Sequence, residues 1–323
     1  CGSCADDLLC TPTGRCWDNS VTPVARHGQL AIDGTKIVDS HGDVTQLKGV
    51  STQWLNWEQA YSTSREAMRW LRDNWGLSVF RIANGIEGQN GYLTEPADRL
   101  EMVRDIIDNA IANEVYVLVD WHTHEPEHLD EAKAFFAAIA EEYGDEPNVI
   151  YELFNEPLAL DWSTELKPYH EELLAVIRAH DPDNLVVVGT PRWDQRPDLA
   201  VADPIADANV AYTLHFYACS HQAAIRANGS AALAGGLPLF VTEWGATHAD
   251  GGTAANPGVC ETPARDWHAW LEENDVSWAA WKLDDGDDSS SMLATGASVN
   301  GGWDEDDLHG HAYLVREFML DER

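Results

Sequence analysis

The chain has 323 residues, of which 44% are hydrophobic, and it carries 55 acidic against 20 basic side chains, for a formal net charge of -35. This length and apolar content favour one large α/β barrel or two smaller domains, and 14 tryptophans argue against disorder. The charge excludes binding to nucleic acid or anionic membranes through positive patches, and it disfavours an anionic polysaccharide as substrate. No apolar run reaches the roughly 20 residues that a membrane span needs.

Acidic residues crowd a sequence that has few lysines, namely Lys36, Lys48, Lys133, Lys167 and Lys282. Such a composition is typical of proteins adapted to high salt, where screening reduces the repulsion between carboxylates. We therefore expect a halophilic source. The chain opens at Cys1 without a charged and apolar leader, so we expect that any secretion signal has been removed and that the protein is secreted and extracellular.

The first 16 residues hold four of the six cysteines, Cys1, Cys4, Cys10 and Cys16. Their spacing lacks the two separate C-x2-C halves of a zinc ribbon, so two disulfides in a short N-terminal knot are favoured over a zinc site. The sequence does not fix the connectivity; Cys1–Cys10 with Cys4–Cys16 is one choice, and a lipid-modified Cys1 is a minor alternative. We interpret residues 1–26 as a Cys-rich extension and 27–323 as the main domain.

After this extension the pattern predicts a β-hairpin over 30–32 and 36–39, with Asp33 and Gly34 at its turn. Strands and helices then alternate. Most of the strands are continuous apolar runs, as expected of parallel strands buried on both faces. The eight predicted strands are 46–50, 79–83, 116–121, 149–154, 185–189, 211–216, 239–242 and 278–283.

Helical periodicity fills the intervals between these strands. The predicted helices are 64–74, 97–113, 130–143, 168–180, 222–234, 263–274 and 311–319. Eight β-α units over roughly 280 residues predict a single-domain (β/α)8 or TIM barrel, whose active site lies at the carboxyl ends of its strands.

Two of the predicted strands end on a glutamate, Glu156 and Glu243. Hydrolysis of a glycosidic bond needs two carboxyl groups, one as acid/base and one as nucleophile. A lone polar residue at a strand end is more often structural, but here polar or aromatic groups follow six strands. In a barrel these groups converge on one cleft. They are Arg81, Asp120 to His122, Asn155 with Glu156, His215 to Tyr217, Glu243 and Trp281.

Residues from about 27 to 319 resemble glycoside hydrolase family 5, most closely its bacterial-type endoglucanase (cellulase) branch. The resemblance implies a catalytic domain over 27–323. It rests on motifs that occur in family order, including Gln46-Leu-Lys-Gly-Val-Ser51, Trp70-Leu-Arg-Asp-Asn-Trp-Gly76, Asp120-Trp-His122, Tyr151-Glu-Leu-Phe-Asn-Glu-Pro157, Leu214-His-Phe-Tyr217, Phe240-Val-Thr-Glu-Trp-Gly245 and Gly301-Gly-Trp303.

The resemblance places the acid/base on Glu156 and the nucleophile on Glu243. Arg81 would keep the nucleophile ionised, and Tyr217 would donate a hydrogen bond to it. Asn155 would hold the sugar 2-hydroxyl. The remaining implied roles are hydrogen bonds from His122 and His215 to sugar hydroxyls and to the carboxylates.

Three tryptophans, Trp57, Trp193 and Trp281, match positions where the family stacks aromatic rings on glucose. Core packing is the alternative for each of them, and Trp54 lies close enough to exchange roles with Trp57. His221 keeps its family position. These residues complete the expected substrate-binding set together with His122.

Four positions depart from the family pattern: Gln53 for a histidine, Glu58 for a tyrosine, Gly85 for an aromatic residue, and Gly286 for a lysine that contacts the sugar. The catalytic pair is unaffected, but the subsites on the non-reducing side are altered. Two interpretations are open: a shifted substrate preference, or a cation lost to the general acidification. Cys219 replaces a glycine, and with Cys260 it is expected to form a disulfide between two rim loops; two free buried thiols are the alternative.

The resemblance implies a retaining endo-β-1,4-glucanase that acts on a β-glucan polysaccharide, without a cofactor and as a monomer. The alternatives are the same chemistry on β-mannan, xyloglucan or mixed-linkage glucan, and a non-catalytic glycan-binding barrel. Acidic runs over 284–288 and 304–307 do not match a calcium-binding loop, so we expect no metal site.

Overall fold

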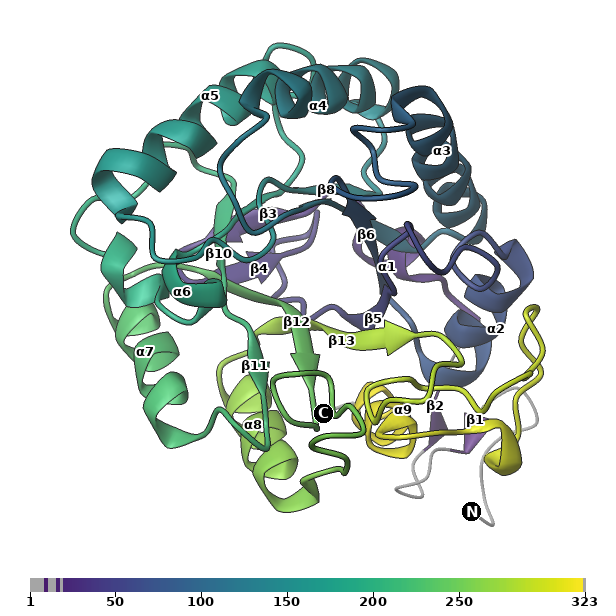
Figure 1. Ribbon diagram of the computed structural model, residues 1–323. Coiled ribbons are helices and arrows are strands. Elements are labelled where there is room, and N and C mark those ends of the chain that lie inside the picture. The colour runs from purple at the N-terminus through teal and green to yellow at the C-terminus, as the bar shows by residue number, and fades with distance from the viewer. Residues whose placement is uncertain (1–8, 11–15, 18–19, 322–323) are drawn as a thin grey trace.

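The computed structural model describes residues 9–10, 16–17 and 20–321. Eight parallel strands form a closed ring in which the last strand, β13, pairs with the first, β5, and β10 pairs directly with β12. Figure 1 shows this ring in the centre with helices around it. The predicted (β/α)8 barrel is confirmed. Its strands are β5 (Lys48–Thr52), β6 (Val79–Gly85), β7 (Tyr116–His122), β8 (Val149–Glu152), β9 (Val186–Val188), β10 (Val210–Thr213), β12 (Leu239–Gly245) and β13 (Ser277–Leu283).

The outer helices agree with the predicted ones to within two residues at each end. They are α2 (Arg65–Trp75), α3 (Pro96–Asn113), α4 (Leu129–Tyr143), α5 (Lys167–Arg178), α7 (Ala223–Ala234), α8 (Glu261–Glu273) and α9 (Ala312–Met319). After β9 the chain forms only two short turns, α6 (Pro191–Asp194) and the 3-10 turn η2 (Pro197–Ala200). Among the described residues, no helix has the length and apolar character to cross a membrane.

Shorter elements complete the fold. The strand β11 (Phe216–Tyr217) continues the sixth barrel strand and pairs with the upper part of β12. The others are α1 (Pro23–His27), the π-helical turn η1 (Trp162–Leu166) and the 3-10 turn η3 (Glu305–Asp307). These turns were not predicted, because each is too short to show a periodic pattern.

The predicted hairpin is formed by β3 (Ala31–Asp33) and β4 (Lys36–Val38), which pair antiparallel. The turn between them includes Gly34, whose φ of 61° is in the left-handed region that glycine adopts easily. Leu30 and Ile37 pack with Leu47 and Val79 at the amino end of the barrel. The hairpin therefore closes the floor of the barrel.

The N-terminal extension is described only in part. The backbones of β1 (Leu9–Cys10) and β2 (Cys16–Trp17) pair antiparallel, with Cys10 opposite Cys16. Cys1 and Cys4 lie outside the described residues. The two expected disulfides, Cys1–Cys10 and Cys4–Cys16, therefore stay predictions.

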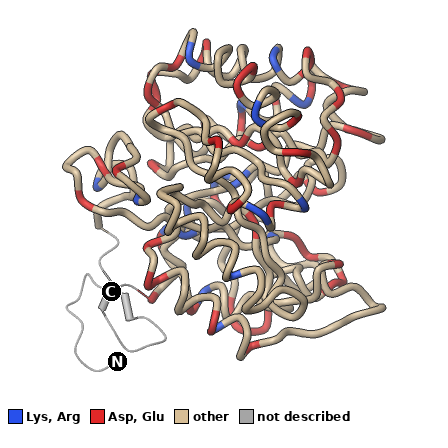
Figure 2. The backbone as a smooth tube through the Cα atoms, turned by 90° about the vertical axis from the view of Figure 1, so that its left-hand side faces the viewer, with Lys and Arg blue, Asp and Glu red and all other residues tan. Residues whose placement is uncertain are grey.

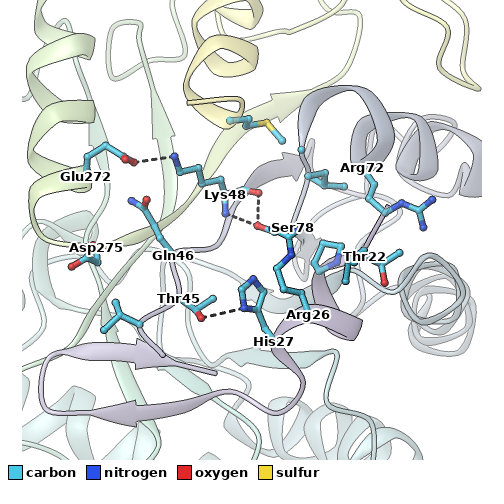
Figure 3. A pocket seen from close by; sticks show the side chains of 16 residues that line it. Thr22, Arg26, His27, Thr45, Gln46, Lys48, Arg72, Ser78, Glu272 and Asp275 are labelled. Carbon is cyan, nitrogen blue, oxygen red and sulfur yellow. Dashed lines mark hydrogen bonds and ion pairs between the residues drawn. The ribbon is translucent and has the colours of Figure 1, made fainter. Parts of the chain in front are cut away.

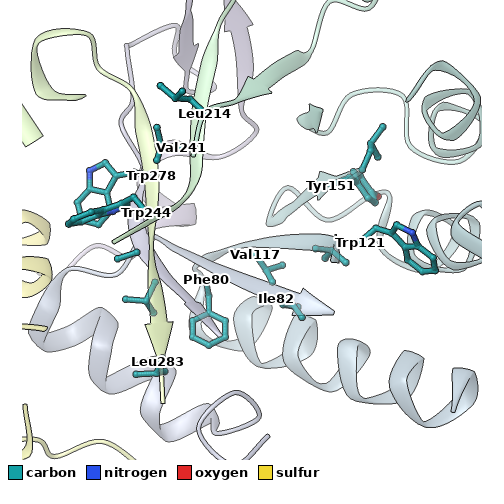
Figure 4. Packing of buried hydrophobic residues seen from close by; sticks show 14 of the residues in the cluster. Phe80, Ile82, Val117, Trp121, Tyr151, Leu214, Val241, Trp244, Trp278 and Leu283 are labelled. Atoms are coloured by element: carbon teal, nitrogen blue, oxygen red, sulfur yellow. The ribbon is translucent and has the colours of Figure 1, made fainter. Parts of the chain in front are cut away.

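Successive side chains along each strand point alternately outward and inward, and they form two apolar layers, one beneath the helices and one inside the barrel. Side chains such as Phe80, Val117, Tyr151 and Trp244 point outward and pack beneath the helices (Figure 4). Their neighbours, including Val79, Leu118, Ile150 and Phe240, fill the barrel interior near its floor. Two residues further along the same strands, the interior positions become polar. They are Arg81, Asp120, Glu152 and Thr242, all buried.

Candidate active site

A cleft of about 290 Å³ opens above this polar layer, at the carboxyl ends of the strands. Its wall combines strand-end residues with parts of the loops after β5, β7, β12 and β13. The residues that line it are Gln53, Trp54, His122, His124, Asn155, Glu156, Tyr217, Glu243, Ala249 to Gly251, Trp281, Lys282 and Asp288. Six of the eleven predicted catalytic and binding residues are in this set, and Arg81 and His215 lie directly beneath it.

A local irregularity in β12 turns Glu243 into the cleft. Phe240 faces the interior and Trp244 faces the helices, so strict alternation between them is broken. The pairing of β12 with β13 shifts register between Val241 and Trp244. Such a bulge places two successive side chains, Thr242 and Glu243, on the inner side, as bulges beside active sites commonly do.

The carboxylate of Glu243 has a donor on each oxygen. Tyr217 donates from its phenol to Oε1 at 2.6 Å, and Arg81 donates from one terminal nitrogen to Oε2 at 3.0 Å. Burial and the neighbouring Glu243 raise the pKa of Tyr217 well above its usual value, so the phenol keeps its proton. Glu243 is thus oriented and its negative charge is stabilised.

Arg81 is completely buried and connects the site to the polar layer below. It contacts Glu152 through its Nε at 2.7 Å and Asp120 at 3.0 Å, and it donates to the Asn155 Oδ1 at 2.7 Å. Three carboxylates thus surround one guanidinium. Burial raises the pKa of Asp120 to about 7, although Arg81 opposes this. The bond to Arg81 fixes Asn155 so that its amide nitrogen remains for the cleft.

Glu156 lies between two imidazoles. His215 Nδ1 is 3.1 Å from Oε1, and His124 Nε2 is 3.3 Å from Oε2. Burial by itself would raise the pKa of Glu156, but the hydrogen bonds with His124 and His215 outweigh it and lower that pKa. Both imidazoles therefore favour the carboxylate form of Glu156.

His215 is fixed from the other side. Its Nε2 lies 2.7 Å from the Thr242 hydroxyl, which donates to Oε1 of Glu152 at 2.6 Å. Since the single hydroxyl proton of Thr242 goes to Glu152, His215 carries a proton on Nε2. Its Nδ1 then exchanges a proton with Glu156. Burial opposes a charge on His215, but Asp194, Glu156 and Glu243 raise its pKa to about 9.

The loop after β9 brings Asp194 to this network through unusual backbone geometry. Three successive residues, Arg192, Trp193 and Asp194, have φ values of 64°, 56° and 56°. Such conformations are costly for residues other than glycine and are concentrated at functional sites. Here they place the buried Asp194 carboxyl 3.6 Å from His215 Nδ1. Burial raises the pKa of Asp194 well above its usual value.

Aromatic rings form the other wall of the cleft. Trp281 stacks on His122 with centroids 5.6 Å apart and planes inclined by 5°. Of the two tryptophans that the sequence left interchangeable, Trp54 lines the cleft and Trp57 stacks on it at 5.0 Å, with 67% of Trp57 exposed. The two together extend an aromatic surface out of the cleft.

Trp54 and Asn56 explain one departure from the family pattern. A Cβ atom on Gly85 would lie 2.1 Å from Asn56 Oδ1 and 2.7 Å from the Trp54 ring. A side chain at position 85 is therefore excluded, because Asn56 and Trp54 fill the space. Glu58 is also structural, since its carboxylate accepts hydrogen bonds from the Tyr61 backbone and the Ser62 hydroxyl.

Trp193 and His221 lie outside the set that lines the cleft. Trp193 is half exposed, and its backbone N–H donates to the carbonyl of Pro157, next to Glu156. His221 lies behind Tyr217, whose backbone N–H donates to His221 Nδ1 at 3.0 Å. Their roles in substrate binding stay predictions.

The cleft retains a cation despite the glycine at position 286. Lys282 follows Trp281 along β13, and its ammonium group lies 2.8 Å from Asp284 and 2.9 Å from Asp288. Lys282 and Asp288 both line the cleft. Lys282 stands four residues before Gly286, so this wall carries a cation, and the two interpretations of the glycine stay predictions.

The disulfide between Cys219 and Cys260 is confirmed. It connects the loop after β11 to the end of the loop after β12. The latter loop carries Ala249, Asp250 and Gly251 to the cleft. The covalent connection thus restrains one wall of the site.

Several residues of the site were not identified from the sequence: Asp194, Thr242, Glu152 and His124. For Glu152 and Thr242 a signal exists, since each lies two residues beyond an interior apolar residue, Ile150 or Phe240. Asp194 and His124 follow strands β9 and β7 in irregular segments, where the sequence has no periodicity that would predict the direction of a side chain.

A second hollow, of about 360 Å³, lies at the opposite end of the barrel (Figure 3). The buried Lys48 pairs with the equally buried Glu272 at 3.1 Å and donates to the Asp321 carbonyl at 2.6 Å. Arg72 likewise pairs with Asp73. The contacts of Lys48 anchor the end of α9 to the barrel floor and give this hollow a structural role.

The spacing of the two glutamates defines the class of the site. One carboxylate oxygen of each of Glu156 and Glu243 and one ring nitrogen of His215 all lie within 4.8 Å of one another. Retaining glycosidases hold their carboxyl groups roughly 5–5.5 Å apart, whereas inverting ones need roughly 6.5–9.5 Å. At the carboxyl end of a (β/α)8 barrel, this pair has the arrangement of a retaining glycosidase.

Comparison with known families agrees with this class. Residues 38–287 match the family model of cellulase, glycosyl hydrolase family 5. The chain belongs to this family. Endoglucanase N of Pectobacterium atrosepticum is 39% identical over 303 residues, covering 92% of this chain and 67% of that protein. Endoglucanase Z of Dickeya dadantii is 41% identical, covering 81% of this chain and 61% of that protein.

Solved structures show the same relationship. The catalytic domain of an endoglucanase of Thermobifida fusca superposes with a TM-score of 0.87 at 31% identity, covering 93% of this chain and all of that domain. A variant of that domain has been solved in complex with cellotetraose. A protein of Cytophaga hutchinsonii gives a TM-score of 0.89 at 37% identity and covers 92% of this chain and 96% of its own. The chain spans between 56% and 67% of the length of the first five curated relatives, all named endoglucanases.

Proposed function

We propose that this chain is a retaining endo-β-1,4-glucanase that cleaves internal bonds of cellulose-type chains by double displacement. The observation that carries the proposal is the approach of Glu156 and Glu243 to within 4.8 Å. An inverting mechanism has no room for its water at this distance. The similarity to endoglucanases, one of which binds cellotetraose in a solved complex, supports the choice of a β-1,4-glucan.

In the first step Glu243 attacks the anomeric carbon while Glu156 transfers a proton to the departing glycosidic oxygen. A covalent glycosyl ester on Glu243 forms, and the C1–O bond to the leaving chain breaks. Arg81 and Tyr217 hold the Glu243 carboxylate in place for this attack. Asn155, fixed by Arg81, is placed to bind the 2-hydroxyl of the reacting sugar.

In the second step Glu156, now a carboxylate, takes a proton from water, and the hydroxide adds to the anomeric carbon. Glu243 is released and Glu156 regains its proton. The contact with His215 holds the proton that the reaction uses, because Nδ1 accepts a hydrogen bond from the acid form of Glu156.

Substrate binding is assigned to the aromatic wall. The flat faces of Trp281 and of the Trp54–Trp57 pair offer stacking surfaces for glucose rings, and His122 borders both. Burial and Arg81 lower the pKa of His122, so it is neutral; its Nδ1 donates to Asp120 at 2.6 Å. Its Nε2 then accepts from a sugar hydroxyl.

Product analysis tests the proposal. Cellopentaose, carboxymethyl-cellulose, mannan, xyloglucan and barley glucan are each incubated with the enzyme, and the initial anomer is read by proton NMR. We expect the β-anomer, a rapid fall in the viscosity of carboxymethyl-cellulose, and fastest cleavage of β-1,4-glucan. A preference for mannan or xyloglucan would reassign the substrate, and an α-anomer would contradict the retaining mechanism. The absence of any hydrolysis by the intact Glu156 and Glu243 pair would point to a glycan-binding barrel.

A halophilic and extracellular setting is part of the same proposal. It is supported by the net charge of -35 and by the sparse basic residues among acidic ones in Figure 2. Export is supported by the disulfide Cys219–Cys260, since such bonds persist in oxidising compartments. Expression of the native gene with detection of the product in the culture medium tests the location.

A further inference from the structure

Among the described residues, His124 is a side-chain partner of Glu156 that the mechanism above does not use. It lies in the loop between β7 and α4, and its Nε2 is 3.3 Å from Glu156 Oε2. His215 contacts the other oxygen, Oε1, at 3.1 Å. Both oxygens of the carboxyl therefore face an imidazole, one from the loop after β7 and one from the segment between β10 and β11.

The imidazole of His124 is held in position. It stacks on Trp54 with centroids 6.0 Å apart and planes inclined by 28°. The preceding residue, Thr123, donates its hydroxyl to Glu87 at 2.6 Å and accepts from the Glu156 backbone N–H at 3.2 Å. The His124 side chain remains 35% exposed and lines the cleft. The loop therefore fixes the contact between His124 and Glu156, and His124 can exchange protons with solvent.

The charges around His124 favour its protonated form. The acidic groups that face it are Glu156 after β8, Glu243 on β12 and Glu87 after β6, and the basic one is His122 on β7. The hydrogen bond to Glu156 raises the pKa of His124. His122 is kept neutral by its burial.

Given the function proposed above, we propose that His124 is a positioning residue for the acid/base Glu156. Its N–H orients Oε2 and stabilises the carboxylate that forms when the proton moves to the glycosidic oxygen. No proton is consumed, because Glu156 recovers one from water in the second step. A charged donor beside Glu156 makes the carboxyl a stronger acid, which matters for a sugar leaving group and not for one that departs unprotonated.

Two variants separate this role from simple packing. His124→Phe keeps a flat ring against Trp54 and loses the N–H, while His124→Asn keeps a polar group and loses the charge. His128→Asn is the matched control, since His128 lies on the same loop, is 40% exposed and pairs with Glu131. Each protein is checked by thermal unfolding, and kcat/KM is measured on cellopentaose and on 2,4-dinitrophenyl β-cellobioside.

We expect both His124 variants to lose about 10- to 100-fold in kcat/KM on cellopentaose and less than about threefold on the dinitrophenyl substrate, whose leaving group needs no acid. Loss of a positive charge raises the pKa of Glu156 and of His215. The alkaline limb of the kcat/KM profile should therefore move to higher pH, by roughly half a unit or more. His128→Asn should match the wild type on both substrates.

Three outcomes would overturn the role of His124: equal losses on both substrates, no loss on cellopentaose, or an alkaline limb that stays in place. A wild-type enzyme that cleaves neither substrate would instead refute the proposed function, and the role of His124 with it. If His124→Phe does not fold, the ratio between the two substrates for His124→Asn decides alone.

Discussion

The phenolic oxygen of Tyr217 lies 2.6 Å from Oε1 of Glu243, at the point where the short strand β11 pairs with β12. The two residues come from neighbouring strands of the ring, and the bulge in β12 turns Glu243 towards the tyrosine. This contact depends on two departures from regular strand geometry, the break before β11 and the register shift in β12.

Tyr217→Phe removes this donor and leaves Oε1 of Glu243 without it. We expect kcat/KM on cellopentaose to fall about 10- to 100-fold, since a hydrogen bond to a charged group contributes about 1.5–3 kcal/mol. Steady-state kinetics measure the loss. Tyr313→Phe, at a tyrosine that is 40% exposed on α9, serves as the control and should leave the rate unchanged. Equal rates for all three proteins would remove Tyr217 from the mechanism.

The disulfide Cys219–Cys260 closes a sequence separation of 41 residues. A loop of that length predicts a loss of about 2–4 kcal/mol in the free energy of unfolding when both cysteines become alanine. KM should rise because the loop carrying Ala249 to Gly251 is released. Urea unfolding and steady-state kinetics on Cys219→Ala/Cys260→Ala measure both effects. Unchanged stability would show that neighbouring contacts hold the loops without the bond.

His215 should make stability depend on pH. Its folded pKa of about 9 lies above the ordinary value of 6.5, so its contribution is fully present below pH 6.5 and is lost as the pH rises through about 9. The difference in unfolding free energy between the wild type and His215→Asn should therefore shrink between pH 6 and pH 10. A difference that grows over this range would mean that His215 is neutral in the folded protein.

Salt should stabilise the protein. With a net charge of -35, repulsion among surface carboxylates opposes folding, and added salt screens it. We expect the midpoint of thermal unfolding to rise steadily between about 0.05 and 1 M sodium chloride. At about 1 M the Debye length has fallen to about 3 Å, so repulsion between surface carboxylates is largely screened. A midpoint that is high in dilute buffer and insensitive to salt would contradict the proposed adaptation.

The strands and helices of the barrel are readable from the sequence because parallel strands buried on both faces are continuous apolar runs, bounded by amphipathic helices. Glu156 and Glu243 were found because a carboxylate interrupts such a run. The same reasoning applied at a spacing of two residues identifies Glu152 from Ile150.

The loops mark the limit of sequence-based prediction. The side chains of His124 and Lys282 both point into the cleft. That direction depends on the local backbone conformation of a loop or a strand end, which the sequence pattern does not predict. Asp194 comes close to His215 because three successive residues adopt the left-handed region. The sequence does not predict this conformation, because residues such as Trp193 rarely adopt it. Trp54 could not be separated from Trp57 because three residues of loop decide which ring turns inward.

Trapping of the covalent intermediate tests the central claim most directly. The enzyme is incubated with 2,4-dinitrophenyl 2-deoxy-2-fluoro-β-cellobioside, digested, and its peptides are analysed by mass spectrometry. Because the fluorine slows the second step, a glycosyl ester should accumulate, and we expect it on Glu243. Glu243→Gln should remain unlabelled. A label on Glu156, or an active enzyme that accumulates no ester and releases the α-anomer, would contradict the assignment of the two carboxylates.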